Sequence, residues 1–246
     1  MTERQRTAIV TGAARRVGRA ISEALLADGW RVVAQVRDEG DPVAEGATRV
    51  ATDLADPASA ARIFDAAGEG VTLLVNSAAR FAPDSLAQPD ANEFSRHMDV
   101  NVRMPALLIA ELARRHGGEE ALVVNILDSK LGAPNPDFLS YTLSKYALAG
   151  LTEVSARALA TQGIRVNAIA PALMLPSGEQ DRAAFERVHA LNPLAYGIEV
   201  DDLVGAIRFL VEQRGVTGQT LTLDGGQRFL ALPRDVAFLD EEEGSD

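Results

Sequence analysis

The sequence predicts an α/β protein with helices on both faces of a doubly wound parallel sheet of about seven strands. Short apolar, β-branched runs alternate along the chain with helical patterns of ten or more residues. Such alternation implies parallel strands joined by right-handed crossovers. A glycine-containing turn follows the first strand and opens a helix, which places the fold in the Rossmann type. Because no repeat or low-complexity linker divides the 246 residues, we expect a single domain over residues 1–246.

Each predicted element follows from composition and periodicity. Strands are predicted at residues 7–11, 31–36, 49–52, 71–75, 122–127, 164–170 and 220–223, where short apolar runs end at turn residues. Helices are predicted at residues 17–26, 57–67, 90–116, 141–161, 178–190 and 201–211. Pro105 lies inside the third helix and must end or kink it near its middle. The acidic end, residues 240–246, has the composition of a disordered tail.

Composition excludes several classes of function. The net charge of −11 argues against a nucleic-acid partner, which demands a basic footprint. There is no cysteine, and His97, His116 and His189 lie far apart in the chain, so we expect no metal site. Neither a signal peptide nor a run of about 18 apolar residues is present. We therefore expect a cytoplasmic protein that binds a small molecule and no membrane.

The turn after the first strand, TGAARRVG, predicts an anion site. Gly12 and Gly18 let the backbone approach a ligand closely, and the N-terminus of the following helix offers free N–H groups and a partial positive charge. Arg15 and Arg16 oppose that partial charge, at a cost of roughly 0.3–1 kcal/mol each unless an anion binds there. The alternative is two solvated arginines on an exposed turn.

The end of the second strand indicates which dinucleotide would bind. Arg37 stands where an NAD enzyme usually carries an acidic residue for the ribose hydroxyls. A guanidinium can grip a 2′-phosphate with two donors, so Arg37 favours NADP(H) over NAD(H). Asp38 is the counter-argument, because a shift of one residue at the strand end would bring its carboxylate to the ribose. After the fourth strand, Asn76 to Ala79 are small residues that let a planar ligand approach.

Tyr141 and Lys145 form a possible proton-transfer pair. On a helix that begins near Ser140, their spacing of four places both side chains on one face, about 6 Å apart along the axis. An ammonium beside a phenol lowers the pKa of the phenol, which predicts proton donation near neutral pH. By itself this spacing is a weak motif that more often marks an ordinary helix N-terminus with a solvated lysine, and its place in the rest of the chain is what favours a proton-transfer pair.

Five motifs in order give the chain a specific resemblance to the short-chain dehydrogenase/reductase family over residues 6–229. They are TGAARRVG, NSAA, Asn101 in the interrupted helix, YTLSK and VNAIAPAL, with Asp53 after the third strand. The resemblance implies an NAD(P)(H) oxidoreductase in which Tyr141 is the acid/base, Lys145 binds the nicotinamide ribose and Asn101 supports a proton relay. It implies a homotetramer, makes Tyr141 a cofactor contact as well as the acid/base, and adds these further cofactor contacts: Val17, Asp53, Leu54, Asn76, Ala78 and Pro171.

Two departures from the family pattern narrow the expected substrate. Asp128 occupies the place thirteen positions before the tyrosine where most members carry serine, and Arg16 replaces the middle glycine of the first turn. Both departures are similar to the pteridine reductase and dihydromonapterin reductase branch. Phe81 matches the aromatic residue that stacks on the pterin ring there. The alternatives are a turn-forming aspartate and a loop-anchoring phenylalanine.

Chemistry gives Asp128 a separate rationale. An ionised carboxylate would repel the alkoxide that develops on a ketone, whereas reduction of a C=N bond requires a proton on nitrogen. We therefore expect NADPH-dependent reduction of a dihydropterin-like ring, with Arg16, Phe81, Asp128 and Tyr141 at the substrate. A carbonyl or 3-oxoacyl thioester reductase and a dinucleotide-binding regulator without turnover are the alternatives. Residues 229–246 contain apolar side chains that favour packing on their own domain; the alternatives are that they cover a subunit interface or the pocket of a neighbouring subunit.

Overall fold

The computed structural model describes residues 5–176, 182–236 and 238. Within them, seven parallel strands form one sheet in the order β3-β2-β1-β4-β5-β6-β7. Their bounds are β1 Thr7–Val10, β2 Arg31–Val36, β3 Thr48–Ala51, β4 Val71–Asn76, β5 Ala121–Ile126, β6 Ile164–Pro171 and β7 Thr220–Leu223. The chain begins in the middle of the sheet, runs out to β3 and returns to β4, so its winding reverses between β1 and β4. The predicted doubly wound fold is confirmed.

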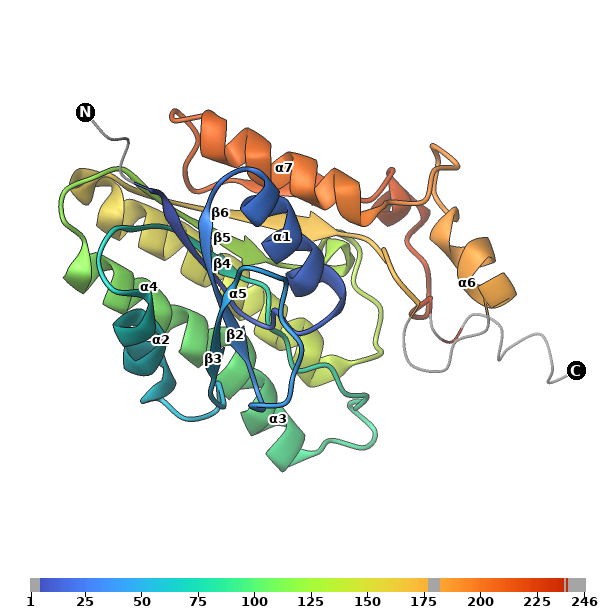
Figure 1. Ribbon diagram of the computed structural model, residues 1–246. Coiled ribbons are helices and arrows are strands. Elements are labelled where there is room, and N and C mark those ends of the chain that lie inside the picture. The colour runs from blue at the N-terminus through green and yellow to red at the C-terminus, as the bar shows by residue number, and fades with distance from the viewer. Residues whose placement is uncertain (1–4, 177–181, 237, 239–246) are drawn as a thin grey trace, which may run out of the picture.

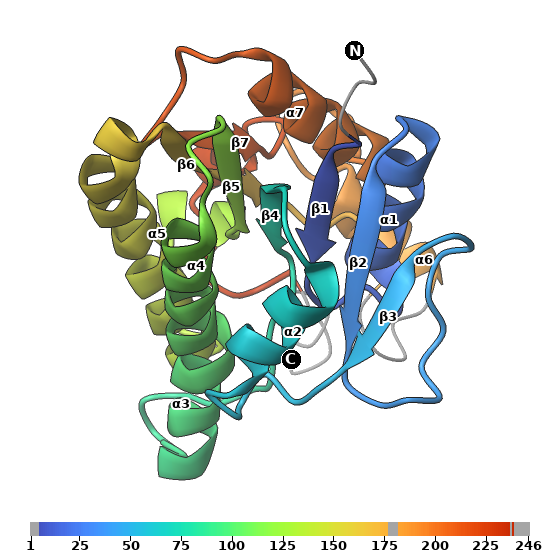
Figure 2. The same cartoon turned by 60° about the vertical axis from the view of Figure 1, so that its left-hand side comes forward.

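Helices cover both faces of this sheet (Figure 1). On one face, α1 (Arg16–Ala27) and α7 (Val200–Glu212) pack against each other and the strands. On the other lie α2 (Ser59–Ala67), α4 (Met104–Arg115) and α5 (Leu139–Leu159), as the turned view also shows (Figure 2). Two apolar cores result: Ile21 and Leu210 belong to the first, Phe64 and Leu108 to the second. Burial on both faces explains why the central strands read as continuous apolar runs.

Local chemistry fixes the turn between β1 and α1. Gly12 has a φ of +67°, and a Cβ there would lie 2.8 Å from Cα of Ala78 after β4. A Cβ on Gly18 would lie 2.3 Å from the carbonyl oxygen of Gly12. Glycine is required at both positions because the backbone passes too close for a side chain. The turn is therefore pressed against the neighbouring strand, at the point where the winding of the sheet reverses.

The helix predicted over residues 90–116 is interrupted, but one turn earlier than expected. It consists of α3 (Ala91–Met98), a π-helical turn at Asp99–Arg103 and α4, and Pro105 lies in the first turn of α4. Proline is tolerated there because the first helical N–H groups lack intrahelical partners. The disruption falls on the preceding turn, since the proline ring removes a backbone donor and crowds the turn before it. This irregular turn carries Asn101.

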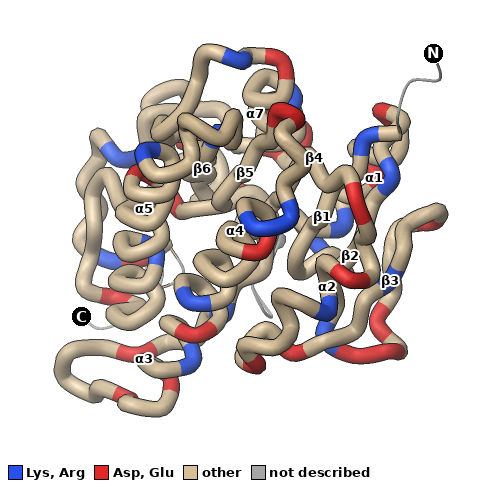
Figure 3. The backbone as a smooth tube through the Cα atoms, turned by 90° about the vertical axis from the view of Figure 1, so that its left-hand side faces the viewer, with Lys and Arg blue, Asp and Glu red and all other residues tan. Residues whose placement is uncertain are grey.

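The remaining elements connect these layers. Three short turns follow strand or helix ends, Ser129–Gly132 (η2), Ala160–Gln162 (η3) and Gln227–Leu230 (η4), and α6 spans Arg182–His189. The predicted acidic tail lies outside the described residues, as does the start of the helix predicted at residue 178. Among the residues that the structure describes, no helix is both long and apolar enough to cross a membrane. Acidic and basic residues are interspersed along the helices facing the viewer in Figure 3.

Candidate active site

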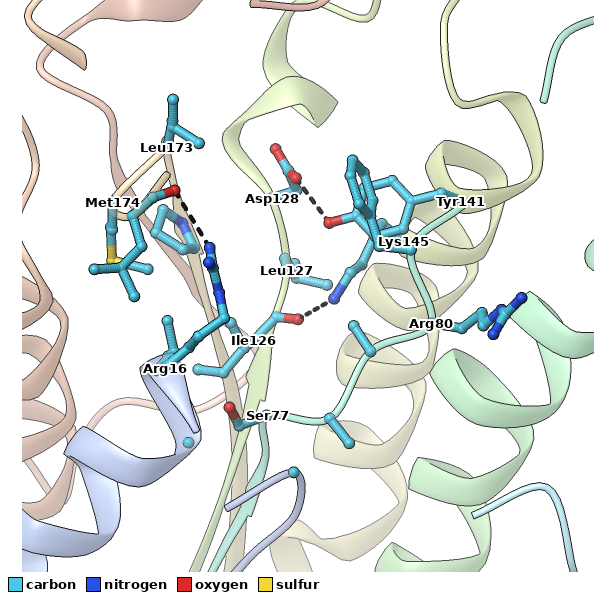
Figure 4. A pocket seen from close by; sticks show the side chains of 18 of the residues that line it. Arg16, Ser77, Arg80, Ile126, Leu127, Asp128, Tyr141, Lys145, Leu173 and Met174 are labelled. Carbon is cyan, nitrogen blue, oxygen red and sulfur yellow. Dashed lines mark hydrogen bonds between the residues drawn. The ribbon is translucent and has the colours of Figure 1, made fainter. Parts of the chain in front are cut away.

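A deep cleft of about 1310 Å³ opens at the carboxyl ends of the strands. Ligands of open α/β sheets bind at this edge, where the winding reverses. The cleft brings together all the predicted site residues except Asn76 and Asn101, and Figure 4 shows part of its lining. It exceeds the usual range of about 300–1,000 Å³ for a drug-sized ligand, so it can hold a dinucleotide and a second molecule together.

The glycine turn and the start of α1 form one wall of the cleft. Gly12, Arg15, Arg16, Val17 and Gly18 all line it. Arg16 begins α1 with a φ of 53°, so the helix starts one residue earlier than predicted. The first N–H groups of the helix face outward without intrahelical partners. This wall therefore offers backbone donors and positive charge to an anion.

Arg16 is exposed, but its guanidinium is hydrogen-bonded to another part of the chain. Its guanidinium donates to the carbonyl oxygens of Leu175 and Pro176, in the loop that follows β6. Figure 4 shows Arg16 reaching toward this loop beside Met174. Burial lowers the pKa of Arg16, and the positive charge of Arg15 lowers it further. An anion between the two arginines would relieve that repulsion. Arg16 thus links the predicted phosphate turn to the loop on the opposite side of the cleft.

The structure distinguishes Arg37 from its neighbour Asp38. Arg37 lines the cleft, and its Nε lies 3.5 Å from Oδ2 of Asp38. The arginine side chain is 73% exposed, which leaves it accessible to a phosphate. Further cleft residues that were predicted as cofactor contacts are Asp53, Leu54, Ala78 and Pro171. The strand end therefore presents arginine rather than aspartate to the ligand space.

Asn76 was predicted as a cofactor contact but does not line the cleft. It is buried at the end of β4, and its Nδ2 donates to Oδ1 of Asn125 on β5 at 2.8 Å. Its own Oδ1 is buried without a partner among the described residues. The observed contacts of Asn76 thus join two central strands below the floor of the cleft.

Asp128 and Tyr141 form a hydrogen-bonded pair at the centre of the cleft (Figure 4). The Tyr141 hydroxyl donates to Oδ2 of Asp128 at 2.8 Å, and the backbone N–H of Lys130 donates to Oδ1 at 2.9 Å. Asp128 therefore forms the turn after β5 and also contacts the phenol. Burial raises the pKa of Asp128, against the opposing effect of the Lys130 and Tyr141 hydrogen bonds. A carboxyl group with a raised pKa can carry a proton closer to neutral pH.

The predicted lowering of the pKa of Tyr141 is wrong for this state of the protein. Burial raises the pKa of Tyr141 well above 10, and the neighbouring Asp128 carboxylate raises it further. Lys145 does lie on the same helix face, with Nζ 5.6 Å from the centroid of the Tyr141 ring. Its ammonium, however, donates to the carbonyl oxygen of Ile126 at 2.7 Å. The sequence pattern located Tyr141 and Lys145. It did not include the burial of Tyr141 or its contact with the Asp128 carboxylate, which are the two causes of its raised pKa.

Lys145 is itself buried in the cleft wall. Burial lowers the pKa of Lys145 to about 8, although the charge of Asp128 acts in the opposite direction. The bond to Ile126 holds the ammonium over the end of β5 (Figure 4). Lys145 can therefore change its charge near physiological pH.

Asn101 is buried, so its placement on a solvent-facing helix surface is excluded. Its Oδ1 accepts from the backbone N–H of Arg80, and its Nδ2 donates to the Arg80 carbonyl oxygen and to Oγ of Ser144. Ser144 in turn donates to the carbonyl oxygen of Tyr141 at 2.6 Å. Asn101 thus ties the loop after β4 to the helix that carries Tyr141. The role in a proton relay stays a prediction.

Phe81 lies beside Tyr141 as part of an aromatic cluster. Its ring stacks on Phe138 with centroids 4.4 Å apart and meets the edge of Tyr141 at 4.7 Å. Half of its surface is still exposed, at 49%, and it lines the cleft. Phe81 both anchors the loop and presents a ring face, so the two interpretations of this residue are compatible.

Sequence reasoning missed the wall opposite the phosphate turn. Lys130 and the C-terminal residues Arg228, Leu232, Arg234 and Asp235 line the cleft there. The C-terminal residues come from beyond the last strand and reach the cleft through contacts with residues about 100 positions earlier. The apolar residues of the extension indicated that it packs on its own domain, which the stacking of Phe238 on Phe138 agrees with, but they did not indicate that its charged residues reach the cleft.

Residues of the cleft fit a pyridine dinucleotide, because they combine backbone donors, adjacent arginines and close approach of the backbone at Gly12 and Gly18. Fold and cleft together define an oxidoreductase of the dinucleotide-binding type. The model of a protein family described as enoyl-(acyl carrier protein) reductase matches residues 12–228. The chain belongs to the short-chain dehydrogenase/reductase family, as its motifs predicted.

Three relatives illustrate the range of this family. The crystal structure of FolM alternative dihydrofolate reductase 1 from Brucella suis in complex with NADP is 36% identical, with a TM-score of 0.84, and the alignment covers 91% of this chain and 95% of that one. Dihydromonapterin reductase from Enterobacter sp. (strain 638) is 29% identical, over 91% of this chain and 97% of the relative. Carbonyl reductase [NADPH] 2 from Sus scrofa is 30% identical, over 89% and 95%. The similarity to a pteridine reductase branch is therefore confirmed, beside relatives that act on other substrates.

Proposed function

We propose that this protein is an NADPH-dependent reductase of a pteridine-like substrate, converting a dihydropterin to a tetrahydropterin. The observation that carries this proposal is the 2.8 Å hydrogen bond from Tyr141 to Asp128. A serine hydroxyl would stabilise an alkoxide, whereas this pair carries a proton and places a carboxylate where an alkoxide would be repelled. The FolM and dihydromonapterin reductase relatives support the same substrate class.

Binding of NADP(H) is the first part of this proposal. The N–H groups at the start of α1, with Arg15 and Arg16, would hold the pyrophosphate, and Arg37 would hold the 2′-phosphate. Lys145 would contact the nicotinamide ribose. Bound there, NADPH supplies a hydride. The NADP complex of the FolM relative and the name of the carbonyl reductase support this choice of cofactor.

Proton delivery is the second part. Tyr141 donates a proton toward the ring nitrogen of the C=N bond, and the Asp128 carboxylate takes up a proton from solvent in the cleft and returns it to the Tyr141 oxygen. The raised pKa of Asp128 suits it to this supply. Phe81 offers its exposed face to the planar ring, and Arg16 lies where it can donate to a heteroatom of that ring. Hydride and proton together reduce one C=N bond.

A substrate panel tests the proposal. NADPH absorbance is followed with dihydropterins, with ketones and with acetoacetyl thioesters, on wild type and on Asp128→Ser. We expect turnover of dihydropterins by wild type. We expect Asp128→Ser to lose about 100-fold of that activity, the lower end of the range of about 10²–10⁴ for a proton-transfer group, while gaining ketone reduction. Wild-type turnover of only the thioester would refute the pterin proposal.

The second candidate is a carbonyl or 3-oxoacyl thioester reductase. It is favoured by the carbonyl reductase relative. The carboxylate at residue 128 argues against it. A regulator without turnover would bind NADPH and reduce no member of the panel, and Tyr141→Phe would leave its biological effect intact.

We also infer a homo-oligomer, with a tetramer as the expected form. The family resemblance supports it, and α5 exposes apolar side chains at Leu143, Tyr146 and Val154 on its outer side. A single species of monomer mass in sedimentation at micromolar concentration would contradict this inference.

A further inference from the structure

A segment from the end of the chain lies across the cleft beside Asp128 and Tyr141. It consists of residues 227–236 and Phe238, and we call it the C-terminal strap. The strap begins with the η4 turn after β7, and Leu232, Arg234, Asp235 and Val236 line the cleft. Its closest partners belong to residues 128–141, the stretch that contains both members of the proton-transfer pair. The strap and this stretch are about 100 residues apart in sequence.

One contact joins the strap to the beginning of that stretch. Lys130 Nζ donates to Oδ2 of Asp235 at 3.0 Å and to the carbonyl oxygen of Asp137 at 2.6 Å. The Lys130 side chain is 8% exposed and that of Asp235 is 17% exposed, so the pair is largely shielded from solvent. Lys130 also donates its backbone N–H to Asp128. The ion pair therefore lies two residues from the carboxylate that accepts from Tyr141.

A second set of contacts joins the strap to the end of the stretch. Arg234 Nε donates to both carboxylate oxygens of Asp137, at 3.1 and 2.9 Å, and the Asp235 N–H donates to Oδ2 at 2.8 Å. The ring of Phe238 stacks on Phe138 with centroids 5.4 Å apart. Phe138 immediately precedes α5 and has a φ of 54°. A bulky residue keeps such a left-handed conformation only where its surroundings hold it.

Packing at the base of the strap leaves little freedom. A Cβ on Gly132 would lie 2.7 Å from Cδ of Arg228, so the η2 turn passes directly over that side chain. Arg228 is itself bonded to the buried carboxylate of Asp224 at 2.8 Å. The η2 turn, which follows Asp128, therefore packs on Arg228 of the strap. This contact adds to the ion pairs that Arg234 and Asp235 form with Asp137 and Lys130.

We propose that the C-terminal strap is a positioning element for the reaction, with Arg234 and Asp235 as its positioning residues. Its contacts with Lys130 and Asp137 hold the two ends of the 128–141 stretch and so fix the Tyr141 hydroxyl against Asp128. Buried pairs of this kind select one geometry more than they add stability. A displacement of about 1 Å at a reacting group can cost about 100-fold in rate. The inference rests on the proposed function only for the choice of substrate.

Substitutions in the full chain test this role. Arg234→Met removes the pair with Asp137, and Asp235→Asn removes the pair with Lys130. Arg208→Met is the control away from the cleft, because Arg208 also contacts both carboxylate oxygens of one aspartate, Asp28 at the end of α1, at 2.8 and 2.9 Å. Each variant is assayed for kcat and KM with a dihydropterin, for NADPH dissociation by fluorescence and for its melting temperature. Arg234→Lys keeps a cation next to Asp137 and serves as the conservative variant.

We expect kcat to fall about 10- to 100-fold in Arg234→Met and Asp235→Asn, with NADPH affinity within about twofold of wild type. Arg234→Lys should recover most of the loss, and Arg208→Met should keep wild-type kcat even where its melting temperature falls. The proposal is overturned if the strap variants keep kcat within twofold of the Arg208→Met control. It is also overturned if kcat falls only in proportion to folded protein. Turnover of a ketone in place of a dihydropterin would instead refute the proposed substrate, and the same variants measured with that ketone would then decide the role of the strap.

Discussion

The two halves of the cleft are built in different ways. The cofactor half consists of short segments that directly follow strands β1 to β4, and its charged side chains, such as Arg37, are exposed. The catalytic half combines the 128–141 stretch with a strap from beyond residue 226, and its charged groups, Asp128 and Lys145 among them, are partly or fully buried. In the first half, backbone turns and exposed cations face the space where a ligand would bind. In the second, ionisable groups face one another.

This difference separates binding from proton chemistry. Water screens the exposed cations of the cofactor half, which leaves them accessible to an anion. Burial shifts the ionisable groups of the catalytic half: it raises the pKa of Tyr141 well above its usual value, raises the pKa of Asp128 and lowers the pKa of Lys145 to about 8. Substitutions in the cofactor half should therefore change NADPH affinity, and substitutions in the catalytic half should change turnover.

The sharpest test of this separation is Tyr141→Phe. It removes the proton donor and leaves the ring that packs against Phe81. We expect kcat to fall about 10²- to 10⁴-fold, the usual contribution of a general acid, with the Kd for NADPH almost unchanged. Stopped-flow or steady-state NADPH oxidation and a fluorescence titration measure the two quantities. A tenfold loss of NADPH affinity in this variant would show that the two halves are not separable.

The cofactor half of the cleft could be predicted from the sequence more fully than the catalytic half. The β1 turn, Arg37 and the Tyr141–Lys145 spacing depend on residues close together in the chain, so periodicity and glycine placement located them. The direction of the Tyr141 pKa, the buried bonds of Asn101 and the strap depend on burial and on contacts across about 20 to 100 residues. A local sequence pattern shows neither the burial of a side chain nor its contacts with residues far away in the chain. Asn76 shows the same limit, since its pairing with Asn125 on the neighbouring strand is invisible in the sequence.

Arg37→Ala is the converse test, in the cofactor half. Loss of one charge-assisted contact to a phosphate costs about 1.5–3 kcal/mol when it is shielded, and exposure of Arg37 places the expected effect near the lower end. We expect the Kd for NADPH to rise about tenfold, the Kd for NADH to stay within about twofold, and kcat at saturating NADPH to be unchanged. Arg31→Ala is a suitable control, because Arg31 donates to the carbonyl oxygens of Ala66 and Ala67 at the other end of the sheet. Equal weakening of NADPH and NADH binding would contradict the role of Arg37 at a 2′-phosphate.

Lys145 belongs to both halves, and its titration should connect them. Burial lowers the pKa of Lys145 from 10.5 to about 8, so the ammonium carries its charge below pH 8 and loses it above. The value of kcat/KM for NADPH reports the ionisation of the free enzyme. If the charge is required to receive the nicotinamide ribose, kcat/KM should be about half-maximal at pH 8 and fall about tenfold for each further pH unit. Lys145→Arg keeps a charge throughout this range, and we expect it to lower kcat/KM at pH 7 while losing the decline above pH 8. Persistence of the decline in Lys145→Arg would assign it to another group and would restrict Lys145 to holding the end of β5 through Ile126.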